Sequence, residues 1–178
     1  MIKYLLPILL LSFTQVLAQQ RVTLNNFNRK NGAVVTIAND QFTVSWPAGK
    51  NEKGQLVLNM NKADALFKSI GLATGSIVND LDPVFLLTVG KRDLVSQNGW
   101  NIFFDKVPLK PFKAHQIEID KQNANVSSLG SRTIITIGEL KAPGFSGNLE
   151  ITLYNGSPLI NIAAVMSTAI DSTAIIYD

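Results

Sequence analysis

The chain has 178 residues, 46% of them hydrophobic, with a formal net charge of +3 at pH 7. It contains no cysteine, which excludes both a disulfide framework and a lipid anchor attached through sulfur. Even in the densest basic region, from Lys50 to Lys68, acidic residues interrupt the lysines and no aromatic residues alternate with them. Nucleic-acid binding needs a basic patch, so we expect no nucleic-acid partner.

The N-terminus has the layout of a secretory signal peptide. Lys3 precedes an apolar run from Tyr4 to Leu11, and Ala18 supplies a small residue for cleavage. The run is too short to cross a bilayer, and no later run reaches the required length. We therefore expect a signal peptide at residues 1–18, a secreted or periplasmic protein, and no membrane contact after cleavage. A lead-in at 19–32 and one β-sandwich domain at 33–178 complete the predicted organisation.

From Ala33 onward the apolar residues mostly alternate with polar ones, and turn-forming residues interrupt the pattern about every ten positions. This is typical of an all-β protein with antiparallel strands in a sandwich. Residues 41–46 and 55–60 form a predicted hairpin around a turn at 51–54. Trp46 shares a face with two apolar residues of the first strand, which favours a place in the core.

Three segments depart from simple alternation. Residues 61–72 fit either two turns of helix or a connecting segment. Residues 83–90 and 158–167 carry apolar side chains at both odd and even positions, and hence on both faces of an extended strand. This predicts strands covered on both faces by a further layer, sheet or domain. Two prolines at 107–113 indicate an extended connection rather than a central strand.

The C-terminal third returns to alternation. Strands are predicted within 131–140 and 149–154, with Ile135, Ile137, Leu149, Ile151 and Leu153 on the buried face. Residues 172–178 still have the pattern of a strand where the sequence stops. This favours the front part of a longer protein over a sandwich whose last strand happens to be terminal.

Few residues carry chemistry. Asp80 and Asp82 would lie on the same side of an extended segment, as the paired carboxylates of a hydrolase require, although Asp82 could instead cap the turn before Pro83. In an extended strand, His115 would lie on the same face as Ile117 and Ile119, which is typical of a packing residue. Trp100 follows Asn98-Gly99, where a loop could present its ring to a sugar, although its parity also fits the core.

These residues make only a weak candidate site. Trp100, Asp80, Asp82 and His115 are the candidate substrate-binding residues, and no catalytic residue is assigned. With one histidine and no cysteine, the sequence motivates neither a metal site nor a Ser-His-Asp triad, and no cofactor is expected.

Several blocks of the sequence carry a resemblance to a known class. They are GLATGSIVNDLDPVFLLTVGKRDL, GWNIFFDKVP, and above all GNLEITLYNGSPLINIAAVMST followed by AIIYD. Together they resemble the N-terminal galactose-mutarotase-like β-supersandwich of large secreted bacterial proteins of the glycoside-hydrolase kind. In such proteins the sandwich packs against a downstream catalytic barrel. The resemblance implies a carbohydrate-related context, and no functional residue of the class carries over to a position of this chain.

Three hypotheses about function follow. The favoured one is an exported, non-catalytic module of a carbohydrate-active protein, whose partners are a polysaccharide or oligosaccharide and a downstream catalytic domain or other protein. The second is a stand-alone glycan-processing enzyme in which Asp80, Asp82 and Glu118 converge near Trp100. The third is an envelope adhesion or assembly protein that a partner completes by adding a β-strand.

Overall fold

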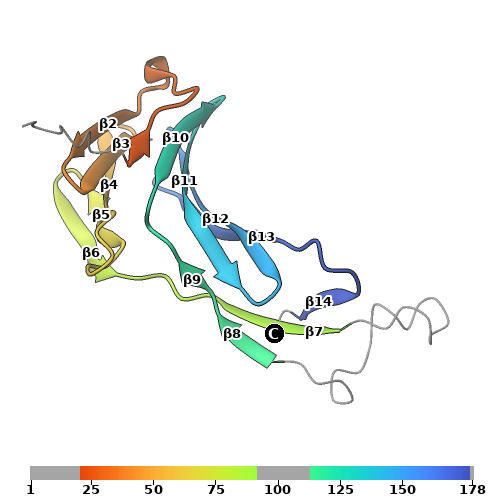
Figure 1. Ribbon diagram of the computed structural model, residues 1–178. Helices are drawn as coiled ribbons and strands as arrows, with labels where there is room; N and C mark the ends of the chain where they lie inside the picture. The colour runs from red at the N-terminus through yellow and green to blue at the C-terminus, as the bar shows by residue number, and fades with distance from the viewer. Residues whose placement is uncertain (1–20, 92–112, 177–178) are drawn as a thin grey trace, which may run out of the picture.

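The computed structural model describes residues 21–91 and 113–176, which form fourteen β-strands and one short 3-10 turn. The all-β, antiparallel sandwich predicted from the sequence is confirmed (Figure 1). The strands are β1(Val22–Thr23), β2(Val34–Ala38), β3(Gln41–Gly49), β4(Glu52–Asn59), β5(Phe67–Leu72), β6(Gly75–Leu81), β7(Leu86–Lys91), β8(Lys113–Gln116), β9(Glu118–Ile119), β10(Ala124–Leu129), β11(Arg132–Ala142), β12(Phe145–Tyr154), β13(Ile160–Ser167) and β14(Thr173–Ile176). The 3-10 turn is η1(Arg29–Asn31).

The first layer is a five-stranded meander, β2-β3-β4-β5-β6. Its β3–β4 hairpin confirms the predicted pairing, with Phe42 opposite Leu58. The turn is tighter than expected, because the two strands continue to Gly49 and Glu52. Gly49 and Asn51 take positive φ values of 151° and 64°, which let the chain reverse within two residues.

The second layer is built on β1-β10-β11-β12-β13, with β9 also pairing with β11. Pairing within it is antiparallel except for β1 with β10, which brings residues of the N-terminal lead-in into the sheet. The predicted alternation in β11 and β12 is confirmed. The side chains expected on the inner face are completely buried: Ile135, Ile137, Leu149, Ile151 and Leu153.

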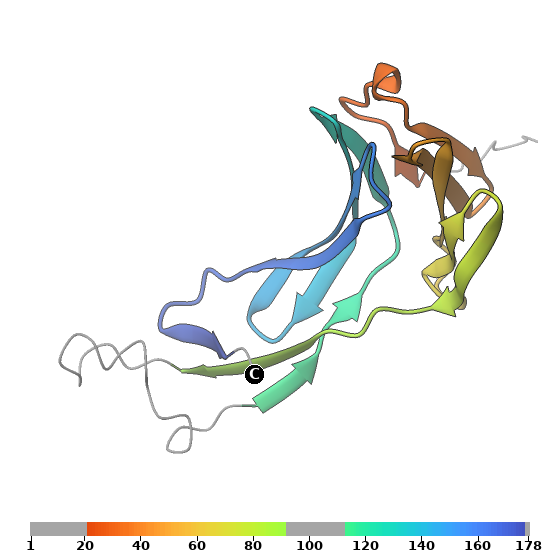
Figure 2. The same ribbon diagram turned by 180° about the vertical axis from the view of Figure 1, so that it is seen from behind.

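The two layers pack face to face around one hydrophobic core (Figures 1 and 2). Trp46 is 2% exposed, as its parity predicts, and its Nε1 donates a hydrogen bond of 2.9 Å to the carbonyl of Ser157. The amide of Gly156 donates to the carbonyl of Pro47 at 2.7 Å. Directional bonds therefore fix the β12–β13 turn against β3, in addition to the apolar packing.

A third sheet, β14-β7-β8, extends from one end of the sandwich (Figure 2). Each of its strands continues from, or leads into, one of the larger sheets: β7 follows β6, β8 precedes β9, and β14 follows β13. One face packs on the core through Leu87, Val89 and Ile175. The pattern of strand in 172–178 is thus confirmed for β14.

The two segments that are apolar on both parities are covered on only one face by the described residues. In 83–90, Leu87 is buried, but Val84 and Leu86 are 64% and 70% exposed. In 158–167, alternate residues from Ile160 onward pack on the core, but Leu159 and Val165 are 67% and 48% exposed. The layer expected on the second face is therefore not supplied by the part of the chain that the structure describes.

The helical alternative for 61–72 is wrong. Residues 61–66 form a connecting segment, and 67–72 form strand β5 between β4 and β6. Gly71 permits this pairing, because a Cβ there would lie 2.7 Å from the Cα of Ser76 in the neighbouring strand. The close backbone approach of a tight hairpin outweighs the weak helical spacing of the apolar residues.

Candidate binding pocket

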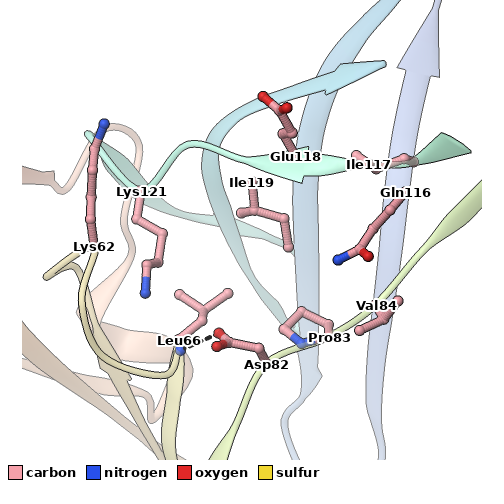
Figure 3. Close-up of a pocket in the computed structure, with 10 residues that line it drawn as sticks. All are labelled: Lys62, Leu66, Asp82, Pro83, Val84, Gln116, Ile117, Glu118, Ile119 and Lys121. Atoms are coloured by element: carbon pink, nitrogen blue, oxygen red, sulfur yellow. Dashed lines mark hydrogen bonds between the residues drawn. The ribbon is translucent and has the colours of Figure 1, made fainter. Parts of the chain in front are cut away.

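A pocket with a volume of about 560 Å³ lies where the three sheets meet. Four separate segments line it: the connection before β5, residues 82–84 between β6 and β7, residues 116–119 in β8 and β9, and Lys121 (Figure 3). Ligand sites in proteins commonly have volumes of this order and combine apolar walls with a few convergent polar groups. The pocket has both features.

Aliphatic side chains form its walls. Leu66 and Ile117 are buried and continue the hydrophobic core to the pocket surface. Ile119 extends from β9 toward Leu66 and Pro83 (Figure 3). Alternation along the strand explains this direction, because the neighbouring Glu118 carboxylate points to the opposite side. Glu118 therefore contributes little to the interior, although it lies at the edge.

Polar groups enter the pocket from two sides. Lys121 is only 7% exposed, and its ammonium donates a hydrogen bond to the backbone carbonyl of Asp64. The Gln116 side-chain amide extends from β8 toward Pro83 (Figure 3). Lys62 stands at the rim, where its Nζ lies 3.0 Å from Oδ1 of Asp120. The pocket thus presents a buried cation, Lys121, and the amide of the exposed Gln116, which can both donate and accept.

Asp82 is the predicted site residue that lines this pocket. Its Oδ1 accepts a 2.7 Å hydrogen bond from the backbone amide of Leu66, which joins the β6–β7 connection to the segment before β5. The expected capping of its own turn is replaced by this longer-range contact. A second lone-pair site and the other carboxylate oxygen remain chemically able to accept from a ligand.

Asp80 is directed elsewhere. It has a positive φ of 50°, so the segment from Asp80 to Asp82 is not the regular extended chain on which the same-side expectation rested. Its Oδ1 lies 2.7 Å from Nζ of Lys68 on β5, at the exposed surface. The hydrogen bond and charge of Asp80 raise the pKa of Lys68 above 10.5. The two carboxylates therefore have separate structural contacts rather than a shared one.

The remaining candidates lie away from the pocket or outside the described residues. His115 is half-buried in β8, opposite Leu87 of β7, on the side of the third sheet that packs on the core. This position agrees with a packing residue. Trp100 and the proposed extended connection at 107–113 fall largely outside the described ranges, so the predicted convergence of three carboxylates near Trp100 stays a prediction.

The sequence reasoning missed Lys121 and Gln116. Lys121 follows a strand in a turn-like stretch, Asp120 to Asn123, where a lysine is normally solvated. Only the packing of two distant segments buries it. Strand alternation predicts that the Gln116 side chain lies on the opposite face from His115 and Ile117. It does not predict that a pocket lies on that face.

Two further findings concern the described residues alone. Within 21–91 and 113–176, no group of three or more histidine, cysteine, aspartate or glutamate side chains is arranged to hold a metal ion. In the same part of the chain, no helix has the length and apolarity needed to span a membrane.

Comparisons with known proteins add no family assignment. The chain matches no protein-family model, no curated protein and no solved structure.

Proposed function

We propose that this chain is an exported, non-catalytic β-sandwich module of a carbohydrate-active protein. It is secreted or periplasmic after removal of residues 1–18, packs against a catalytic domain or another protein, and contacts glycan. The resemblance to the mutarotase-like sandwiches of glycoside-hydrolase-type proteins motivates the carbohydrate context.

The observation that carries the proposal is the open apolar face of β7 and the connection before it. Val84 and Leu86 are two positions apart and both mostly exposed. Burying a fully exposed aliphatic side chain of this size contributes about 1.5–3 kcal/mol, so covering both would favour association. Apolar patches larger than a few hundred Å² are rare on monomeric proteins and mark interaction sites. On β13, Val165 offers a third exposed apolar side chain.

The arrangement of the carboxylates supports a binding role over a hydrolytic one. Glycosidases use two carboxyl groups that flank one bond. Asp80 instead pairs with Lys68, Asp82 holds the Leu66 amide, and the Glu118 carboxylate points away from the pocket centre (Figure 3).

A dye that fluoresces on apolar surfaces tests the docking face. The purified protein should bind the dye, and the double variant Val84→Thr, Leu86→Thr should bind much less of it. Leu129→Thr is the matched control, because Leu129 is 57% exposed at a hairpin end and its replacement should leave most of the signal. Equal thermal unfolding of all three proteins would show that only the surface has changed.

Three results would contradict the proposal. A monomer that binds no dye would leave no open face to cover. Hydrolysis of a glycan by the purified chain would favour the enzyme hypothesis. A stable oligomer in size-exclusion chromatography that survives the double substitution would favour the assembly hypothesis, in which a strand edge rather than the face of β7 makes the contact.

A further inference from the structure

The pocket at the junction of the three sheets contains a buried cation, Lys121, for which the described residues supply one hydrogen-bond acceptor. Lys121 is 7% exposed, and its ammonium has three N–H donors. Among the described residues, one acceptor bonds it, the carbonyl of Asp64, and no carboxylate lies within ion-pair distance. A buried charge is costly unless it is paired and hydrogen-bonded. An anionic ligand in the adjoining pocket would supply the counter-charge that the described residues do not provide.

The nearby charges define what kind of anion fits. Lys62 is engaged by Asp120, so Lys121 is the main cation facing the interior. Asp82 lines the same pocket and would repel a multiply charged group such as a phosphate. A single carboxylate beside Lys121 meets both conditions, because it neutralises one charge and places little negative potential near Asp82.

The other lining groups suit the rest of a sugar. Asp82 can accept from a hydroxyl, and the Gln116 amide can donate to one and accept from another. Leu66 and Ile119 offer an aliphatic surface for the C–H face of a pyranose ring (Figure 3). The volume of about 560 Å³ accommodates one or two sugar units.

We infer that this pocket binds a hexuronate, with the sugar carboxylate on Lys121 and ring hydroxyls on Gln116 and Asp82. The inference rests on the proposed function in that it names the glycan class that the module contacts. It adds a charged sugar and a specific site, neither of which the proposed function requires.

Binding is best measured by NMR on the purified protein, with D-glucuronate and D-galacturonate as probes. At least one of them should shift the amide signals of Asp82, Val84 and residues 116–121, with a Kd on the order of 1 mM, as expected for a single sugar with few contacts. D-Glucuronamide is the matched ligand control, because it keeps the shape and removes the charge. It should bind about tenfold more weakly or worse.

Variants localise the effect. Lys121→Met should abolish hexuronate binding, and Gln116→Ala should weaken it without affecting the fold, because Gln116 is exposed and lies outside the core. Lys68→Met is the protein control, since Lys68 carries the same charge on the exposed surface away from the pocket. If Lys121→Met fails to fold, Gln116→Ala and the amide ligand together still decide the question.

The inference is overturned if neither hexuronate shifts these amides, or if the amide ligand binds as tightly as the acid. A neutral glycan that binds while both hexuronates fail would overturn this inference and leave the proposed function in place. Hexuronate binding by a protein that also binds no apolar dye would support the pocket and contradict the docking face.

Discussion

The contact between Gly54 and Trp46 provides the sharpest test of how the two layers are held together. The indole ring of Trp46 on β3 lies over Gly54 on β4, its direct cross-strand neighbour. A Cβ added at Gly54 would lie 2.6 Å from Cη2 of the ring and closer still to Cε2 and Cζ2. The ring cannot retreat easily, because Trp46 is buried and its Nε1 is bonded to Ser157 across the sandwich. Gly54→Ala should therefore strain or displace the inter-sheet bond.

The expected magnitude comes from two opposing terms. Overpacking a well-filled core costs about 1–3 kcal/mol. Replacing glycine by alanine returns about 0.4–1 kcal/mol through the lower entropy of the unfolded chain. Gly75→Ala is the matched control, because a Cβ at Gly75 has no atom within 4 Å and the residue also lies in a strand. The difference between the two variants isolates the clash, at about 1–3 kcal/mol.

Urea unfolding followed by far-ultraviolet circular dichroism measures this difference without relying on the tryptophan that is perturbed. Gly54→Ala should lower the free energy of unfolding, whereas Gly75→Ala should leave it unchanged or raise it slightly. In a double-mutant cycle, Trp46→Phe should reduce the cost of Gly54→Ala, because the smaller ring leaves room for the methyl group. Equal stabilities of the two alanine variants would refute the reasoning.

Other contacts give further expected outcomes. Asp82→Ala should destabilise by about 1 kcal/mol in thermal unfolding, because it removes the acceptor of the part-buried hydrogen bond from the Leu66 amide, and Asp82→Asn should cost less. Asp80→Asn should return the pKa of Lys68 toward 10.5 in an NMR titration. Because that pKa is raised in the folded protein, the pair favours folding below pH 10.5, and its contribution is lost as the pH rises through the raised value. Leu87→Ala should cost about 2–5 kcal/mol in urea unfolding, whereas Val165→Thr should cost little, because one side chain is buried and the other is exposed.

The parts of the fold that the sequence predicted well are those where neighbouring residues contain the information. Alternation with period two predicts which side chains lie on the same face of a strand. For Ile135, Leu149 and Ile151 that face packs on the core. The β3–β4 hairpin follows for the same reason, since its strands are adjacent in sequence. The predicted turn at 51–54 lies later in the chain than the observed one, which falls between Gly49 and Glu52. The polar stretch at 51–54 contains the end of the turn and the start of β4.

The third sheet and the pocket depend on pairings that local pattern does not contain. β7 pairs with β8 and with β14, and β14 lies more than eighty residues later in the chain. Segments between these strands in the sequence decide which face of β7 is covered. Asp80 shows the limit at single-residue scale. Its positive φ breaks the extended geometry that would have aligned it with Asp82, and aspartate is one of the residues that tolerates this conformation. The burial of Lys121 cannot be inferred from a lysine in a polar turn, and neither can the absence of an ion-pair partner for it among residues 21–91 and 113–176.

Residues 82–86 connect the two proposals physically. Asp82 and Val84 line the pocket, while Val84 and Leu86 form the exposed apolar face. A protein that docks on this face would cover Val84 and thereby narrow one side of the pocket. Sugar binding and docking should then influence each other, and the effect must be reciprocal because both are equilibria on the same molecule. Leu86→Thr, which lies outside the pocket lining, should weaken docking while leaving hexuronate affinity of the isolated chain unchanged. A loss of sugar affinity in that variant would mean that the apolar face supports the pocket rather than a partner.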